Sequence, residues 1–128
     1  MRTRAAAELV GRIMLAAIFL IDGVQQVRFY AATRDYIESF GVSGALLPPA
    51  IALHIAGGLA ICAGFATRIA ALALAGFTLA AALIFHTNLA DVSEFNHFWK
   101  NVALAGAFLL LAVNGPGAWS LDRRARGG

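Results

Sequence analysis

Charge and cysteine are both scarce in this sequence. Of its 128 residues only 13% are Asp, Glu, Lys or Arg, whereas 60% are hydrophobic, and the mean hydropathy is +0.75. A soluble domain of this length could not bury so much apolar side chain, so the composition predicts a protein embedded in a lipid bilayer. Cys62 is the single cysteine, which excludes an intrachain disulfide and a thiolate metal cluster. Its place inside an apolar run favours an inert buried thiol over a catalytic one.

The basic net charge does not indicate a nucleic-acid partner. The chain carries a formal charge of +3 and has a pI near 9.8. Its arginines lie at the chain ends and between apolar runs, with no basic stripe interleaved with aromatic residues. We therefore interpret them as signals of membrane topology.

Four apolar runs predict four membrane-spanning helices, at residues 9–29, 48–65, 69–85 and 98–114. Each is close to the roughly 17–25 residues that one span requires. The fold class expected is an all-α membrane protein, a four-transmembrane-helix bundle forming a single domain over residues 1–128. Residues 30–47 are predicted to form an interfacial amphipathic segment, and residues 66–68 a tight helical turn.

The arginines also predict the orientation. They flank the first run, the 66–68 turn and the C-terminus, whereas the loop with Asp91 and Glu94 is acidic. The positive-inside rule then places both the N- and C-termini in the cytoplasm. The first run resembles a signal peptide, but no small-x-small cleavage site follows before Asp22, so we expect it to be the first span.

Small residues predict where the helices touch. The pairs Ala60/Gly64, Ala71/Ala75 and Gly76/Ala80 have the spacing that lets two membrane helices approach closely. We expect all three pairs to face a neighbouring helix.

Polar groups inside the spans are the candidates for a function. An ionisable side chain at the bilayer centre costs about 2.5 kcal/mol or more, so each needs a partner or a role. At about 1.5 Å per residue, Asp22 and His54 lie at similar depth, roughly 10 Å and 9 Å from the outer ends of their spans. The predicted ligand-binding residues all belong to this outer half of the bundle: Asp22, Gln25, Gln26, His54, His86 and Asn101.

Three interpretations of this polar cluster stay open. Asp22 and His54 would form an ion pair within a closed structural network. Alternatively, the cluster lines a pocket for a quinone or another small lipophilic ligand, because a buried histidine beside a carboxylate suits proton transfer to a quinone oxygen. Metal or haem ligation by His54, His86 or His97 is the third, and it is disfavoured because no metal-ligand spacing is present and small-residue packing leaves little room for haem.

A second group of polar residues is predicted at the inner end, with structural roles. Arg12 lies three residues inside the first span and is expected either to reach Asn114 and Asp122 or to extend to lipid headgroups. Arg68 marks the turn between the second and third spans.

Several short motifs resemble those of the DoxX family. They are Gly11-Arg12, Gly57-Gly58, the turn Gly64-Phe65-Ala66-Thr67-Arg68, His86, Phe98-Trp99-Lys100-Asn101 and the ending Gly115-Pro116-Gly117-Ala118-Trp119-Ser120-Leu121-Asp122. The resemblance covers nearly the whole chain and implies a four-helix inner-membrane protein. For some relatives it implies the membrane subunit of a thiosulfate:quinone oxidoreductase or of another membrane oxidoreductase complex.

This sequence departs from the family pattern at the candidate site. Where a Glu often precedes the Gly-Gly pair in relatives, this chain has His54, and it has Asp22-Gly23 late in the first helix. From the resemblance and the polar cluster together, we expect a redox-associated membrane subunit. It would be at most the quinone-linked membrane subunit of an oxidoreductase, with no cofactor of its own beyond a bound quinone. The alternative is a non-catalytic assembly subunit. Partners expected are the bilayer and other membrane or periplasmic subunits, or a second copy of the chain.

Overall fold

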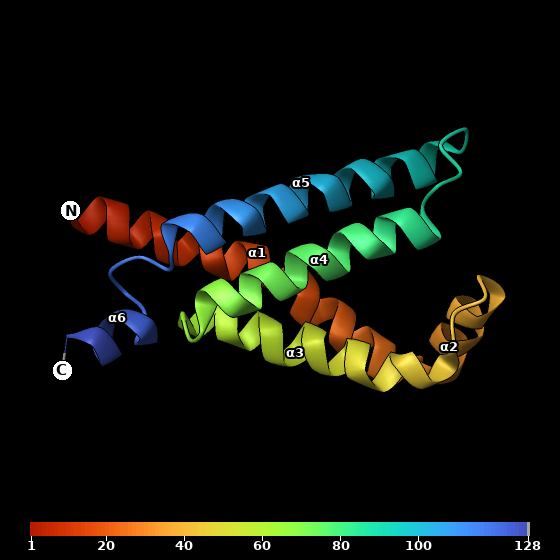
Figure 1. Cartoon of the computed structure of the whole chain (residues 1–128), viewed down its shortest axis with the longest axis horizontal. Helices are drawn as coiled ribbons and strands as arrows, with labels where there is room; N and C mark the ends of the chain where they lie inside the picture. The colour runs from red at the N-terminus through yellow and green to blue at the C-terminus, as the bar shows by residue number, and fades with distance from the viewer. Residues whose placement is uncertain (128) are drawn as a thin grey trace.

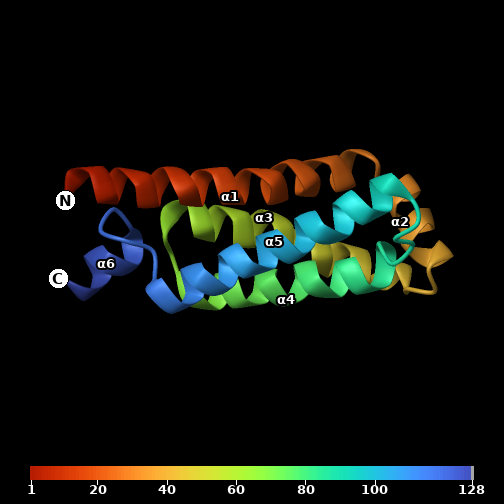
Figure 2. The same ribbon diagram turned by 90° about the horizontal axis from the view of Figure 1, so that it is seen from above.

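A computed structural model describes residues 1–127, which form helices and turns and contain no strand. The prediction of an all-helical fold is confirmed. Four long helices run along one another, with α1 against α3, α3 against α4 and α4 against α5 (Figures 1 and 2). The elements are α1 (Arg2–Arg28), α2 (Tyr30–Ser39), the 3-10 helix η1 (Gly44–Leu46), α3 (Leu47–Ala63), α4 (Thr67–Phe85), α5 (Val92–Asn114) and α6 (Leu121–Arg126).

The helices match the predicted runs closely where the sequence marks their ends. Helices α3 and α4 begin and end within two residues of the predicted boundaries, 48–65 and 69–85. Helix α5 begins six residues before the predicted run because the Asp91 side chain caps it, accepting a hydrogen bond from the backbone N–H of Glu94 at 3.1 Å. An apolar run therefore marks the hydrophobic part of this helix but not its polar first turn.

Two segments are long and apolar enough to cross a membrane by composition alone, Gly44–Ala63 and Thr67–Phe85. Helices α1 and α5 are longer, with 27 and 23 residues. Their apolar stretches are interrupted by charged side chains, Arg12 and Asp22 on α1 and Lys100 on α5.

Small residues bring the helices together, though not at every predicted pair. An ideal Cβ on Gly58 would lie 2.8 Å from Leu20 Cδ2, so α1 and α3 can meet here only because residue 58 has no side chain. Ala71 and Ala75 are buried, as predicted. The prediction for Gly76 was wrong, since no atom lies within 4 Å of an ideal Cβ there. Helix α4 buries Ala71, Leu74, Ala75, Thr78 and Ala82, and Gly76 falls outside this stripe.

The turn between α3 and α4 is as tight as predicted. Gly64 ends α3 in the left-handed region with φ of 69°, and the Phe65 N–H bonds the Ala60 carbonyl at 2.9 Å. Ala66 also has a positive φ, 45°. The hairpin and both chain termini lie at one end of the bundle, and α2 and the α4–α5 loop lie at the other (Figure 2).

Candidate functional site

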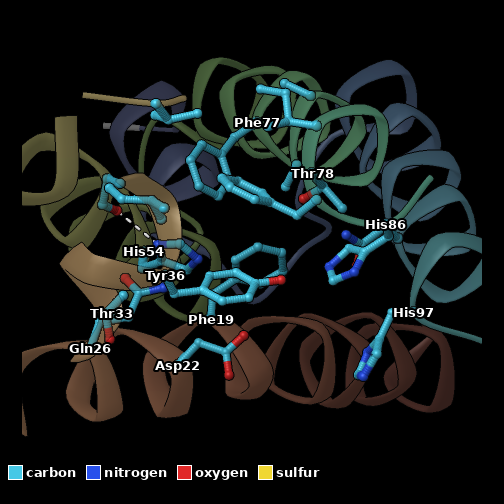
Figure 3. A pocket seen from close by; sticks show the side chains of 18 of the residues that line it. Phe19, Asp22, Gln26, Thr33, Tyr36, His54, Phe77, Thr78, His86 and His97 are labelled. Atoms are coloured by element: carbon cyan, nitrogen blue, oxygen red, sulfur yellow. Dashed lines mark hydrogen bonds between the residues drawn. The ribbon is translucent and has the colours of Figure 1, made fainter. Parts of the chain in front are cut away.

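A cavity of about 460 Å³ opens at the end of the bundle that carries α2. Helices α1, α2, α3, α4 and α5 all contribute to its wall, which combines aromatic and aliphatic surface with polar side chains (Figure 3). Its volume lies within the range of about 300–1,000 Å³ usual for small-molecule sites. The polar residues lining it are Asp22, Gln26, Thr33, Tyr36, His54, Thr78, His86, His97, Lys100 and Asn101.

The structure brings five of the six predicted ligand-binding residues to this cavity. Asp22, Gln26, His54, His86 and Asn101 line it, although they come from positions up to 79 residues apart in the sequence. Gln25 does not line it and is exposed. The reason is helical geometry: at about 100° per residue, Gln26 and Phe19 lie to one side of Asp22 and face the cavity, whereas Gln25 lies to the other side of Asp22.

His54 is the most buried titratable residue of the cavity wall, with 5% of its surface exposed. Its Nδ1 donates a hydrogen bond to the Ala50 carbonyl at 2.8 Å (Figure 3). The imidazole lies between two phenyl rings, with centroids 5.6 Å from Phe19 and 4.9 Å from Phe77. Gly23 allows α1 to approach this closely, since an ideal Cβ there would lie 3.2 Å from His54 Cβ.

The predicted ion pair between Asp22 and His54 is not formed. Within residues 1–127 the ion pairs are Arg4–Glu8, Arg34–Asp35 and His86–Glu94, and the ring nitrogen of His54 that forms a hydrogen bond uses the Ala50 carbonyl. Both residues line the same cavity, so the predicted similarity in depth was right. The Nδ1 of His54 is instead bonded to the backbone of its own helix, four residues before it.

Two buried polar atoms of the wall have no hydrogen-bond partner among the residues described. They are the Thr78 hydroxyl oxygen and the Gln26 Oε1 oxygen, and Thr78 is only 4% exposed. Buried polar groups are nearly always hydrogen-bonded, by protein or by another molecule. These atoms therefore mark positions where a bound molecule would find a ready partner.

A linked group of polar side chains lies at the mouth of the cavity, where α4 ends and α5 begins. His86 Nδ1 bonds Glu94 Oε2 at 2.9 Å, and the His86 ring stacks on that of His97 at 5.1 Å between centroids. Lys100 Nζ donates to His97 Nδ1 at 3.3 Å. In the part of the chain that the structure describes, no three His, Cys, Asp or Glu side chains are placed to hold a metal ion.

Helix α2 adds cavity residues that the sequence analysis did not single out, Thr33 and Tyr36. The Tyr36 ring packs on Phe40 and Phe85, with centroids 5.1 Å and 5.7 Å away. Partial burial, together with the nearby Glu94 carboxylate, raises the pKa of Tyr36 above its ordinary value. The amphipathic pattern of residues 30–47 was the available signal, because its apolar side chains had to face either lipid or the bundle.

The sequence analysis also missed two cavity residues on α4, Phe77 and Thr78. An aromatic ring or a threonine within an apolar run is unremarkable by itself.

At the other end of the bundle, Arg12 and Arg68 donate hydrogen bonds to the carbonyls at the C-terminal ends of α3 and α5. Arg12 is 2% exposed and donates to the carbonyls of Ile61, at 3.1 Å, and Cys62, at 3.0 Å, and also to that of Trp119. Arg68 donates to the carbonyls of Ala112 and Val113, both at 2.9 Å. Carbonyls in the last turn of a helix lack intrahelical partners, and a cation there also complements the helix dipole.

Both predictions for the partners of Arg12 were therefore wrong. Asn114 instead donates to the Leu110 carbonyl of its own helix at 2.8 Å. The Asp122 carboxylate accepts hydrogen bonds from the N–H groups of Ala66, at 2.8 Å, and Thr67, at 2.9 Å, and so caps the start of α4. Burial opposes ionisation of Asp122, but the hydrogen bonds from Thr67 and Ala66 and the charge of Arg126 outweigh it, so its pKa lies below the ordinary value.

Comparison with known proteins identifies the family. The family model described as DoxX matches residues 7–87, which contain most of α1 and all of α2, α3 and α4. The chain belongs to the DoxX family. It is 48% identical over 115 residues to the inner membrane protein YqjF of Escherichia coli K12, covering 90% of this chain and 88% of that protein. It is 40% identical over 123 residues to the inner membrane protein YphA of the same organism, covering 91% and 88%.

No solved structure matches this DoxX-family chain. The family match and the two relatives confirm that it is a protein of the bacterial inner membrane, as the composition predicted for the bilayer and the family resemblance for the inner membrane. Association with the lipid bilayer follows directly.

Proposed function

We propose that α1, α3, α4 and α5 each span the membrane, with both termini in the cytoplasm and residues 1–128 forming one domain. Arg4, Arg123 and Arg126 lie at the end of the bundle that holds the termini, and the acidic loop before α5 lies at the other end. This distribution agrees with the positive-inside rule. Alkaline phosphatase fused after residue 127 should be inactive, and the same reporter fused into the 87–91 loop should be active. The reverse pattern would contradict this orientation.

We further propose that this DoxX-family protein is a redox-associated membrane subunit that binds a quinone or a similar lipophilic molecule in the cavity. The observation that carries the proposal is a buried Thr78 hydroxyl without a partner, in a cavity also lined by Asp22 and His54. A purely structural polar network would satisfy its own groups, since an unsatisfied buried hydroxyl costs about 1–3 kcal/mol.

The cavity wall suits an aromatic head group with an apolar tail. Phe19 and Phe77 flank the His54 ring, and an aromatic ring prefers offset or edge contacts with such neighbours. The Thr78 hydroxyl could donate to a ring carbonyl, and the oxygens of Asp22 and Gln26 could accept from ring hydroxyl groups once the ring is reduced. A bound quinone would supply two-electron chemistry, and this chain's part would be to bind and orient it and to exchange protons through His54 and through the His86–Glu94 pair at the mouth. The electron donor would bind a partner subunit.

A second candidate function is assembly of a larger membrane complex without ligand binding. Gly76 on α4 and Gly106 on α5 face outward with no atom within 4 Å of an ideal Cβ. Outward-facing glycines allow a helix of another subunit, or of a second copy, to pack closely.

A cavity-filling substitution distinguishes the two functions. Ala81→Phe places a ring in the cavity, whereas Ala73→Phe makes the same change on the same helix at an exposed position outside the cavity. Each protein is purified in mild detergent, and its lipid extract is analysed by mass spectrometry for quinones. We expect quinone to co-purify in stoichiometric amounts with wild type and Ala73→Phe and to be lost from Ala81→Phe. Absence of quinone from all three, with partner chains retained, would favour the assembly function.

A further inference from the structure

The side of the cavity formed by α1 and α3 presents hydrogen-bond acceptors. His54 Nδ1 bonds the Ala50 carbonyl at 2.8 Å, and a carbonyl oxygen can only accept. Nδ1 therefore carries the hydrogen, and the neutral ring offers the lone pair of Nε2, which has no hydrogen-bond partner among the described residues. The backbone of α3 thus fixes this histidine as an acceptor toward the cavity.

Asp22 and Gln26 extend this acceptor surface along α1. The Asp22 carboxyl offers acceptor oxygens in either protonation state, and within residues 1–127 it takes part in no ion pair. The Gln26 Oε1 oxygen is buried without a partner. The Thr78 hydroxyl can donate or accept and does not discriminate between ligands.

Most donors of the cavity wall lie on other helices, the Tyr36 hydroxyl on α2 and the Asn101 amide and Lys100 ammonium on α5, whereas on α1 the Gln26 amide nitrogen can donate. At the mouth of the cavity, Lys100 Nζ already donates to His97 Nδ1 at 3.3 Å. The Nδ1 of His86 there is bonded to Glu94 Oε2 at 2.9 Å. The phenyl rings of Phe19 and Phe77 beside His54 have no hydrogen-bonding atoms. A ligand head group beside His54 is therefore recognised chiefly through hydrogens that the ligand itself donates.

We infer that the cavity selects the reduced form of its ligand, a hydroquinone or similar dihydroxylated aromatic ring with an apolar tail, over the oxidised quinone. A quinone has only carbonyl acceptors, which would face the acceptors of His54 and Asp22, whereas a hydroquinone donates two O–H groups. The inference rests on the proposed function and names the redox form that the site prefers. A tenfold preference corresponds to a rise of about 30 mV in the two-electron midpoint potential of the bound ligand.

Equilibrium binding of matched probes to the full-length protein in lipid nanodiscs tests the inference. The probes share one ring and tail: decylubiquinone, its hydroquinone kept under anaerobic conditions, and the 1,4-dimethyl ether of that hydroquinone, which cannot donate. We expect the hydroquinone to bind about tenfold more tightly than the other two, as one or two additional hydrogen bonds would give. Because the dimethyl ether changes the ligand and not the protein, this comparison does not depend on the folding of a variant.

The variant His54→Phe keeps an aromatic ring and removes the acceptor, and Gln25→Ala, which lies outside the cavity, is its control. The hydroquinone preference should fall to about twofold or less in His54→Phe and stay unchanged in Gln25→Ala. Equal affinity for the two redox forms in wild type, or tighter binding of the quinone, would overturn the inference and leave the proposed function intact. Failure of all three probes to bind would overturn both.

Discussion

Removing the Asp122 carboxylate should destabilise the terminal end of the bundle by an amount that the structure allows us to estimate. The carboxylate accepts hydrogen bonds from the Ala66 and Thr67 N–H groups at 2.8 and 2.9 Å, and the Asp122 N–H bonds the Gly64 carbonyl at 2.9 Å. Replacing a capping carboxylate by alanine costs about 0.5–2 kcal/mol. Asp122→Ala leaves two backbone N–H groups without an acceptor at a half-buried position, so we expect it to reduce the free energy of unfolding by about 2 kcal/mol. Asp122→Asn keeps one acceptor oxygen, and we expect it to cost about 1 kcal/mol.

The same cap should depend on pH in a defined direction. The pKa of Asp122 is lower in the folded protein than its ordinary value, so ionised Asp122 contributes stability above the unfolded pKa of about 3.9. This contribution should be lost as the pH falls below about 4 through the lower folded pKa. The stability difference between wild type and Asp122→Ala should therefore be constant from pH 6 to 8 and shrink below about pH 4.

Fluorescence of Trp119 provides the assay. The protein has two tryptophans, and in a Trp99→Phe background Trp119 alone reports on the segment that holds Asp122. Unfolding in detergent micelles is driven by added dodecyl sulfate and checked by circular dichroism. The control is Asp35→Ala, whose exposed contact with Arg34 at 3.5 Å should contribute less than about 0.5 kcal/mol. The reasoning is refuted if Asp122→Ala unfolds at the same point as the control, or if its deficit persists unchanged at pH 3.

The other predictions concern helix contacts and can be followed in the same unfolding assay. Arg12→Lys keeps the charge but cannot reach three carbonyls on two segments, so we expect a loss of about 2–4 kcal/mol; wild-type stability would contradict the buried cap. Gly58→Ala, whose Cβ would meet Leu20 Cδ2 at 2.8 Å, should cost about 1–3 kcal/mol and be partly rescued by Leu20→Ala, while Gly76→Ala should be neutral or stabilising. Thr78→Val should raise ligand-free stability by about 1–3 kcal/mol because it removes a buried hydroxyl that has no partner; a loss of stability would mean that this hydroxyl is bonded after all.

The sequence predicted the helices well because long apolar runs bounded by Pro, Gly or charged residues leave a simple signal. The Pro48-Pro49 pair and Gly64 mark the two ends of α3, which is why its boundaries were found within two residues. Depth was also predictable, since a fixed rise per residue places Asp22 and His54 at one level. Hydrophobic runs, however, do not show polar helical turns, and the start of α5 was missed for that reason.

The contacts of the polar residues could not be predicted to the same degree. Arg12 is buried among backbone carbonyls because α3 ends beside α1. The sequence does not show which helix end lies beside Arg12; only the packing of the helices does. The orphan carbonyls before Gly64 were a usable signal, because any helix end inside a membrane protein needs donors from elsewhere. Whether Asp22 and His54 bond to each other depends on the direction in which each side chain leaves its helix, and spacing along the chain does not determine this.

Photolabelling most directly tests the central claim that the cavity is a quinone site. Inner-membrane vesicles containing the protein are irradiated with an azido-quinone, with and without an excess of the unlabelled quinone, and labelled peptides are sequenced by mass spectrometry. We predict competable labelling of cavity-lining residues on α1, α3 and α4, such as Phe19, His54 and Phe77. Labelling confined to the outward-facing side chains Leu72 and Val113, and insensitive to competitor, would contradict the account.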